Sequence, residues 1–302
     1  MTQYLVYDVG GTNLKYALMD NDGNIITKGK VASPDNLPAF KQALFDIADQ
    51  FTDEFEAIAM CAPGKIDTKE KTIYYGGALT YLDGFNLVEN LGDRYQVPVS
   101  VENDGKAAAL AEQWLGELKG VDTGAIMTLG IGVGGGIIAN GKLLHGRDFQ
   151  AGELSWMLLR ASEGVEKVTS YTAILCSAVQ MIKRVNESLG NDQLDDGLAA
   201  FTAINKRQPE AYDIFSEFCA NIAQMILNVQ TVINGEKIVI GGGISAQPIL
   251  IEEINYQFEK LLGSNEMLGG QIIPPDIVAA RFQNDANLYG ALYALLLQID
   301  SE

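Results

Sequence analysis

Three glycine-rich segments of this sequence are suited to binding phosphate groups. Asp8-Val9-Gly10-Gly11-Thr12 places a carboxylate, two glycines and a hydroxyl at the end of a short apolar run. Five glycines lie between Gly130 and Gly136, and Gly241-Gly242-Gly243 follows another apolar run. Glycines let the backbone approach an anion, and successive N–H groups form a nest that binds it. Each segment alone is also typical of a tight turn, so the interpretation depends on all three together.

Asp8 can contribute to phosphate binding only through a cation, because a carboxylate repels a phosphate. Mg²⁺ with its shell of oxygen ligands bridges the two groups. The glycines up to Gly136 are not a Walker A loop, since no Gly-Lys-Ser/Thr follows them. A strand rather than a helix is predicted next, which argues against a dinucleotide fingerprint. At Gly241 to Gly243, the lack of side chains leaves room for an adenine or a ribose against the backbone.

The predicted elements place these segments at the ends of strands. Two stretches, beginning at Tyr4 and at Thr123, share the order strand, glycine turn, strand and hairpin turn, which indicates a weak internal repeat. Other apolar runs predict strands at 24–31, 57–62, 97–101 and 237–240. Helical spacing predicts helices at 37–51, 104–115, 172–189, 198–205, 212–234, 249–262 and 286–299. No long linker separates the two halves, so we expect them to face each other across a cleft.

Composition and charge argue against several classes of partner. The chain has 302 residues, 47% of them hydrophobic, and a net charge of -18. Such acidity opposes binding to nucleic acid or to an anionic membrane and favours a small-molecule partner. Cys61, Cys176 and Cys219 are scattered, which is typical of thiols in a reducing compartment. The N-terminus lacks the basic segment of a signal peptide, and no apolar run reaches about 18 residues, so we expect a cytoplasmic protein.

As a set, the motifs resemble those of the ROK family of sugar kinases. The matching segments run in the family's order along nearly the whole chain: Asp8-Val9-Gly10-Gly11-Thr12, Ala62-Pro63-Gly64, Pro98-Val99 with Glu102-Asn103-Asp104, Leu129-Gly130-Ile131-Gly132 with Gly134-Gly135-Gly136, Ala151-Gly152-Glu153, and Ile240-Gly241-Gly242-Gly243-Ile244. The resemblance implies the two-domain α/β fold of actin-like (ribonuclease H-like) ATPases, with a central cleft. We expect residues 1–118 with the C-terminal helix 286–302 to form one domain and residues 119–285 the other.

The same resemblance implies ATP and Mg²⁺ as cofactors, a small carbohydrate as substrate, and a homodimer. Asp8 is expected to hold Mg²⁺ through water or phosphate. The other residues expected to bind ATP are Gly10, Gly11, Thr12, Gly130, Gly132, Gly241, Gly242 and Gly243.

Asp104 resembles the family's catalytic base. It begins the helix predicted at 104–115, so its alternative role is that of an N-cap. A sugar hydroxyl is a poor nucleophile, and a carboxylate within hydrogen-bond reach accepts its proton as the phosphoryl group is transferred. Asn103 offers a donor and an acceptor to neighbouring sugar hydroxyls. Glu102 is expected to point back toward the strand and is given no role.

Glu153 resembles the family's sugar-binding carboxylate, and Glu166 resembles its second one. Most members carry a histidine that binds zinc and sugar where this chain has Trp156, and the cysteine-rich zinc loop is missing here. We therefore predict that the protein holds no zinc. Trp156 is either a core residue or a face on which a sugar ring stacks. The single histidine, His145, is predicted to be a surface loop residue.

A tyrosine-rich stretch from Tyr74 to Tyr81, which includes Gly77, corresponds to the family's sugar-facing loop but lacks its usual Pro-Asn. Zinc-less members that resemble this chain include β-glucoside kinases, which phosphorylate the 6-hydroxyl of a disaccharide such as cellobiose. A kinase for glucose, fructose or an N-acetylhexosamine is the main alternative. A non-catalytic sugar-sensing regulator would carry a helix-turn-helix before the Asp8 segment, and we do not expect one in this protein. Retention of Asp104 and Glu153 argues against a silent ATP-binding protein.

Overall fold

The computed structural model describes residues 2–160, 168–283 and 285–300, and the chain divides into two compact units. The first unit consists of Met1–Gly116, Leu143–Ala151 and Asn284–Glu302, and the second of Glu117–Lys142 and Gly152–Gln283. The units differ from the predicted domains chiefly in the segment Leu143–Ala151, which the sequence analysis placed in the C-terminal domain. His145 ties this segment to the first unit, since its Nε2 lies 2.7 Å from Oε2 of Glu102.

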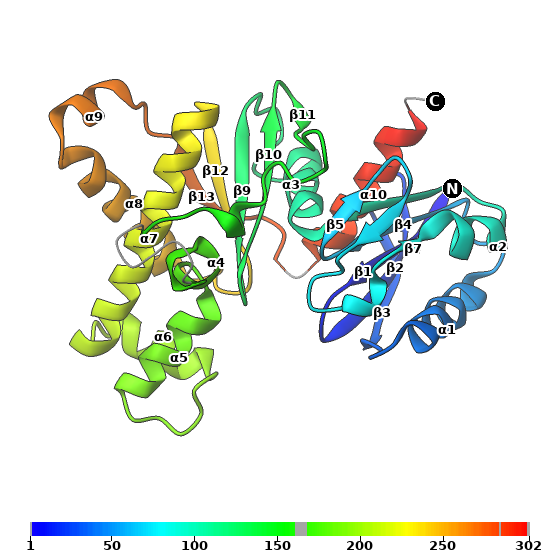
Figure 1. Cartoon of the computed structure of the whole chain (residues 1–302), viewed down its shortest axis with the longest axis horizontal. Helices are drawn as coiled ribbons and strands as arrows, with labels where there is room; N and C mark the ends of the chain where they lie inside the picture. Colours follow the sequence, from blue (N-terminus) through cyan, green and yellow to red (C-terminus); the bar gives the residue numbers. More distant parts are fainter. Residues whose placement is uncertain (1, 161–167, 284, 301–302) are drawn as a thin grey trace. The chain divides into compact units, whose positions relative to one another are not determined.

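The first unit is built on a five-stranded sheet with helices on both faces (Figure 1). Its strands lie in the order β3-β2-β1-β4-β8; β1, β2 and β3 are successively antiparallel, whereas β1, β4 and β8 are parallel. The strands are β1 (Gln3–Val9), β2 (Asn13–Asp20), β3 (Ile25–Ala32), β4 (Ala57–Ala62) and β8 (Val99–Asn103). Helix α1 (Leu37–Ala48) packs on one face, and α3 (Asp104–Leu115) and α10 (Ala286–Ile299) pack on the other.

Apolar side chains of β1 point alternately to the two faces of the sheet, so both faces need a covering helix. Leu5 and Tyr7 point to the core shared with α1, whereas Tyr4 and Val6 point to the core shared with α10. Every residue of β4 is buried, as expected for a parallel strand with helices on both faces. By the same alternation, Asp8 lies on the α10 face of the sheet.

Short elements that the sequence patterns did not predict connect β4 to β8. Strands β5 (Lys65–Asp67), β6 (Thr72–Tyr74) and β7 (Phe85–Asn86) form a small antiparallel sheet. The short helical turns of this unit are η1 (Asp49–Phe51), η2 (Thr80–Leu82), η3 (Val88–Gly92) and α2 (Asp93–Tyr95). Strands of two or three residues are too short to show a hydrophobic period.

The second unit repeats the strand order of the first. Its sheet has the order β11-β10-β9-β12-β13, with β9 and β10 antiparallel and β9, β12 and β13 parallel. The strands are β9 (Gly124–Leu129), β10 (Val133–Ala139), β11 (Lys142–Leu143), β12 (Lys237–Gly241) and β13 (Asp276–Ala279). This shared order agrees with the predicted internal repeat.

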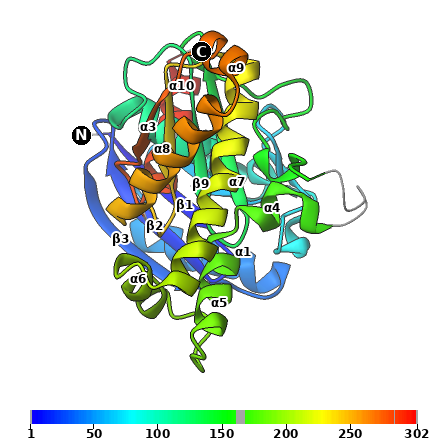
Figure 2. The ribbon, with the colours of Figure 1, turned by 90° about the vertical axis from the view of Figure 1, so that its left-hand side faces the viewer.

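Helices cover one face of this second sheet. Figure 2 shows α7 and α8 lying across it, and their apolar side chains form one core with β9, β12 and β13. The helical elements of this unit are η4 (Leu154–Trp156), η5 (Val168–Ser170), α4 (Thr172–Leu175), α5 (Ala178–Ser188), α6 (Gly197–Asn205), α7 (Pro209–Ile233), α8 (Pro248–Gly263) and α9 (Glu266–Gln271). None of the helices in the described segments is both long enough and apolar enough to cross a membrane.

The glycine-rich turn of the second unit is shorter than the sequence suggested. Gly134 to Gly136 lie inside β10, so the turn between β9 and β10 is confined to Gly130 to Gly132. A Cβ at Gly135 would lie 2.7 Å from the carbonyl oxygen of Gly152, so the strand needs glycine at this position. Absence of a side chain therefore serves packing at Gly135 rather than anion binding.

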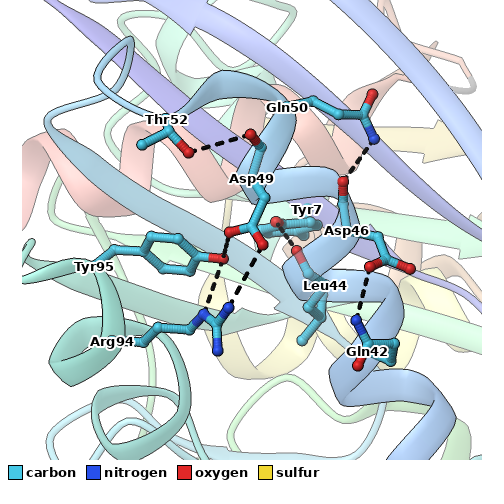
Figure 3. A network of polar contacts seen from close by, with 9 residues as sticks. All are labelled: Tyr7, Gln42, Leu44, Asp46, Asp49, Gln50, Thr52, Arg94 and Tyr95. Atoms are coloured by element: carbon cyan, nitrogen blue, oxygen red, sulfur yellow. Dashed lines mark hydrogen bonds and ion pairs between the residues drawn. The ribbon is translucent and has the colours of Figure 1, made fainter.

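A polar network fixes the end of α1 against the sheet and against α2 (Figure 3). The Tyr7 hydroxyl, which is buried, donates to the Leu44 carbonyl over 2.9 Å. Asp49 accepts from the Tyr95 hydroxyl over 2.6 Å and pairs with Arg94 at 3.5 Å. The Arg94 guanidinium also lies 4.1 Å from the centre of the Phe45 ring. The network holds β1, whose last residues lead into the glycine turn, in place against α1.

We expect Tyr95→Phe to lower the free energy of unfolding by about 1 kcal/mol at pH 8, because it removes one hydrogen bond to a carboxylate. Burial, followed by the hydrogen bond to Asp49, raises the pKa of Tyr95 to about 12 from 10.0. The neutral phenol is therefore favoured in the folded state. Its contribution to stability is complete below pH 10 and is lost as the pH rises through about 12. Urea unfolding of both proteins at pH 8 and pH 11 measures the difference, which should shrink at the higher pH.

Tyr75→Phe is the control, since the Tyr75 side chain is 75% exposed and in the same unit. It should leave the free energy of unfolding unchanged at both pH values. Equal destabilisation by the two variants would contradict the role of the Tyr95–Asp49 bond.

Candidate active site

Parallel strands bring the predicted catalytic and phosphate-binding segments of the first unit to one edge of its sheet. Strands β1, β4 and β8 are adjacent and parallel, so their carboxyl ends lie at the same edge. The turn Gly10 to Thr12 follows β1, Pro63-Gly64 follows β4, and Asp104 follows β8. Open α/β sheets bind their ligands outside the carboxyl ends of the strands. The first unit therefore has a candidate site at this edge.

Asp8 is a buried carboxylate with three protein partners. Its Oδ2 lies 3.0 Å from Nζ of Lys15 in β2, and its Oδ1 accepts from Nδ2 of Asn287 in α10 over 3.0 Å and from Sγ of Cys61 in β4 over 3.3 Å. Only 4% of Asp8 is exposed. A buried charge is tolerated when it is paired and hydrogen-bonded. Lys15 lies directly opposite Asp8 in the β1–β2 register, and Cys61 lies opposite it in the β1–β4 register.

The Gly10 turn is anchored from one side and open on the other. The Gly10 N–H donates to the Asn13 carbonyl over 3.1 Å, and the Ser33 hydroxyl donates to the Gly10 carbonyl. The Ser33 N–H donates to the Thr12 carbonyl over 3.0 Å. Gly11 and Thr12 are exposed, and a Cβ built at Gly11 meets no described atom within 4 Å beyond its chain neighbours. The turn is thus a supported backbone loop that a phosphate can approach.

Asn103, rather than Asp104, caps α3. Its Oδ1 accepts from the Lys106 N–H over 3.2 Å, and its Nδ2 donates to the Gly64 carbonyl over 3.0 Å. Asp104 is the first helical residue and is half-buried. The alternative role that the sequence left open for Asp104 is therefore wrong. A carboxylate in the first turn of a helix is favoured by the helix dipole.

The turn after β4 needs glycine and supports the loop that holds Gly77. Gly64 has a φ of +102°, and a Cβ there would lie 2.8 Å from the Tyr74 carbonyl oxygen. Gly77 also has a positive φ, +57°, and is exposed. Of the tyrosines in this stretch, Tyr75 is 75% exposed, whereas Tyr81 donates to a backbone carbonyl and packs in the α1 core.

The second unit also has two glycine turns at the carboxyl ends of parallel strands. Gly130 to Gly132 follow β9, and Gly241 to Gly243 lie at the end of β12. Gly242 has a φ of +96°, and a Cβ there would lie 2.1 Å from the Leu129 carbonyl oxygen, so the two turns touch through a glycine. The hydroxyl of Ser177, which caps α5, donates to the Ile131 carbonyl over 2.6 Å. Ser177 was not among the residues predicted from the sequence.

Glu153 and Trp156 lie at the two ends of a short helical turn. Glu153 is half-buried, and its Oε1 accepts from the Ser155 hydroxyl over 2.5 Å. Trp156 is 69% exposed, and its ring forms a T-shaped pair with that of Tyr171, with 6.1 Å between ring centres. The interpretation of Trp156 as a core residue is therefore wrong. Glu166 lies outside the described residues.

His145 lies in a loop at the surface, as predicted, but it also has a buried partner. The His145 side chain is 33% exposed. Its Nε2 lies 2.7 Å from Oε2 of Glu102, whose side chain is 3% exposed. Glu102, which was given no role, is therefore the buried partner of the single histidine. Across the described segments, no group of three or more His, Cys, Asp and Glu side chains is arranged to hold a metal ion. The absence of zinc stays a prediction.

Comparison with known proteins identifies the family. The profile of the ROK family matches residues 4–298. This chain belongs to the ROK family. A β-glucoside kinase of Listeria monocytogenes is 31% identical to it over 294 residues, 96% of each chain, and a glucokinase of Halalkalibacterium halodurans is 31% identical over 281 residues, 85% of each. The crystal structure of a ROK family protein from Streptococcus pneumoniae in complex with sucrose superposes on all of both chains, with a TM-score of 0.89 and 29% identity.

These comparisons confirm the predicted fold class and enzyme class. The two sheets with a common strand order are those of the actin-like ATPase fold, to which the ROK kinases belong. By sequence and fold, this ROK chain is a carbohydrate kinase.

We expect the three cysteines to resist thiol reagents in the folded protein. All are buried. Burial raises the pKa of the Cys61 thiol well above its usual value, and the nearby carboxylates Asp8 and Asp104 raise it further. Burial also raises the pKa of Cys176 to about 12 and that of Cys219 well above its usual value. The thiolate is the reactive form, so a change from pH 7 to pH 9 should add little reactivity.

Titration with Ellman's reagent at pH 8 tests this. The native protein should show no rapidly reacting thiol, and the protein unfolded in guanidinium chloride should show three. Rapid reaction of one full equivalent in the native protein would contradict the burial of the cysteines.

Proposed function

We propose that this ROK kinase transfers the γ-phosphoryl group of ATP to the 6-hydroxyl of a β-glucoside such as cellobiose, with Asp104 as the catalytic base. The observation that carries the mechanism is the division of roles at the start of α3. Asn103 caps the helix, and Asp104 follows on the same rigid element. A carboxylate on a rigid element is suited to meeting a substrate hydroxyl in a fixed geometry.

In the proposed reaction, the sugar oxygen attacks the γ-phosphorus while its proton passes to Asp104. The bond between the γ-phosphorus and the oxygen that bridges it to the β-phosphate breaks, and ADP leaves. The transition state is loose, so the position of the carboxylate matters more than its basicity. Asn103, Glu153, Glu166 and Gly77 are proposed to bind the sugar, together with Trp156.

The nucleotide is proposed to bind at the glycine turns of both units. Asp8 is suited to indirect rather than direct coordination of magnesium, because both of its carboxylate oxygens already contact protein donors and the residue is buried. We therefore propose that it holds Mg²⁺ through water or phosphate. When bound, the ion supplies positive charge to the β- and γ-phosphates. The glycine-turn residues proposed to bind ATP are Gly10, Gly11, Thr12, Gly130, Gly132, Gly241, Gly242 and Gly243.

The exposed Trp156 supports a substrate longer than one sugar ring. An indole face is a suitable surface for the apolar face of a sugar, and 69% of this residue is exposed. The Listeria monocytogenes relative is named a β-glucoside kinase, and the ligand of the Streptococcus pneumoniae protein, sucrose, is a disaccharide. The homodimer and the cytoplasmic location stay predictions.

A monosaccharide kinase is the second candidate. The Halalkalibacterium halodurans relative, a glucokinase, has the same 31% identity as the β-glucoside kinase. Glucose, fructose and N-acetylhexosamines are therefore the substrates that the experiments below must compare with cellobiose.

Asp104→Asn should lower kcat by about 10²-fold or more, the usual scale for loss of a general base. The amide keeps the size and polarity of the side chain, so KM for ATP and for the sugar should stay within a few-fold of the wild-type values. A coupled assay for ADP measures all three constants. Asp192→Asn, in an exposed loop of the second unit, is the control and should behave as wild type. Turnover by Asp104→Asn within a few-fold of wild type would rule out the catalytic role.

The substrate is tested by kcat/KM for cellobiose, gentiobiose, glucose, fructose, N-acetylglucosamine and N-acetylmannosamine. We expect a β-glucoside to be preferred at least tenfold, which corresponds to about 1.4 kcal/mol of transition-state binding. Trp156→Ala should remove most of that preference by raising KM for cellobiose while leaving the constants for glucose unchanged. A tenfold preference of the wild type for a monosaccharide would defeat the β-glucoside assignment and leave the kinase assignment intact.

A further inference from the structure

The proposed function gives no role to Glu102, a buried acidic residue beside the proposed site. Glu102 is the residue before Asn103 in β8, and 3% of it is exposed. Its two oxygens have different partners. Oε1 accepts from the Asn103 N–H over 2.8 Å, and Oε2 lies 2.7 Å from Nε2 of His145. An ionised carboxylate only accepts hydrogen bonds, so the imidazole donates from Nε2.

The first of these bonds acts on the segment that carries Asp104. Asn103 makes three hydrogen bonds. Its N–H donates to Glu102, its Oδ1 accepts from the Lys106 N–H, and its Nδ2 donates to the Gly64 carbonyl. The peptide that joins it to Asp104 therefore starts from a fixed residue. A shift of the Glu102 carboxylate would therefore move the Asn103 N–H that it accepts from, and with it the backbone that orients Asp104.

The second bond comes from a loop with a defined shape. The Ala151 N–H donates to the His145 carbonyl over 3.1 Å and closes the loop. Gly146 has a φ of +72°, and a Cβ there would lie 2.9 Å from the Ala151 side chain, so the loop needs glycine at this position. The Phe149 ring and the imidazole form a T-shaped pair, with 6.3 Å between ring centres and 75° between the ring planes. Two residues beyond Ala151, the chain reaches Glu153.

We propose that His145, acting through Glu102, is a positioning residue that holds the Asn103–Asp104 segment in its catalytic geometry and ties it to the loop that leads into Glu153. The proposal rests on the role of Asp104 proposed above. The histidine touches neither substrate nor nucleotide in this scheme. It supplies the hydrogen bond that keeps a buried carboxylate in place, and that carboxylate in turn holds the backbone before the base.

Substitutions at His145 separate positioning from simple stability. His145→Ala should lower kcat by about tenfold or more, since small displacements of a catalytic group are costly, with KM for ATP within about twofold of wild type. His145→Gln places an amide nitrogen the same number of bonds from Cα as Nε2. It should restore kcat to within about threefold of wild type. Thermal unfolding and the folded fraction of each variant are measured beside the kinetics. Wild-type kcat per folded molecule in His145→Ala would overturn the proposal.

A double-mutant cycle tests whether the effect passes through Glu102. Glu102→Gln keeps an acceptor for the Asn103 N–H but replaces the carboxylate that contacts His145 with a neutral amide. In the Glu102→Gln background, His145→Ala should reduce kcat at least threefold less than it does in the wild type. The same reduction in both backgrounds would overturn the proposal.

Arg147→Ala is the matched control. It lies in the same loop, its side chain is 94% exposed, and its one ion pair among the described residues is a 4.0 Å contact with the adjacent Asp148. It should behave as wild type, and a loss of kcat like that of His145→Ala would overturn the proposal. The Asp104→Asn experiment stands apart from this test. If Asp104→Asn is inactive while both His145 variants turn over normally, only the positioning role fails; if Asp104→Asn is active, the proposed base fails.

Discussion

The buried charge of Asp8 is the constraint on which the first unit depends. A carboxylate that is 4% exposed needs donors close by, and here they come from β2, β4 and α10. Asn287 lies 279 positions further along the chain, yet it must reach the end of β1 for the charge to be satisfied. Loss of one donor would leave an undercompensated charge in the interior, which is among the costlier defects a protein can carry. The position of α10 and the environment of Asp8 are therefore linked.

Each unit places its glycine turns where parallel strands end. In the first unit, the ends of β1, β4 and β8 carry Gly10, Gly64 and Asn103, and in the second, the ends of β9 and β12 carry Gly130 and Gly241. A repeated strand order thus supplies two sets of backbone amides on rigid supports. Among the described residues of the first unit, the end of β8 is followed directly by a carboxylate, Asp104, in the first turn of a helix.

Sequence patterns predicted the long elements well because those elements have a clear hydrophobic period. Helices 104–115 and 286–299 and strand 57–62 were predicted with the bounds that the structure has. Strands of the small sheet were missed because two or three residues show no period. The pair His145 and Glu102 was missed because 43 positions separate them, and only tertiary structure brings them together. Asn103 and Asp104 are both good capping residues, so their roles could be separated only by the hydrogen bond to Lys106.

The place of α10 in the first unit has a consequence for biosynthesis. Apolar side chains of β1, β2 and β4 share a core with Leu288, Ala291, Leu292 and Leu295 of that helix. On a ribosome, these strands emerge early, whereas α10 is made only after the whole second unit. At the usual speed of translation, the part of this face that α10 covers would stay exposed for on the order of ten seconds before the helix is made. The nascent chain is thus an expected client for chaperones that shield an unfinished sheet.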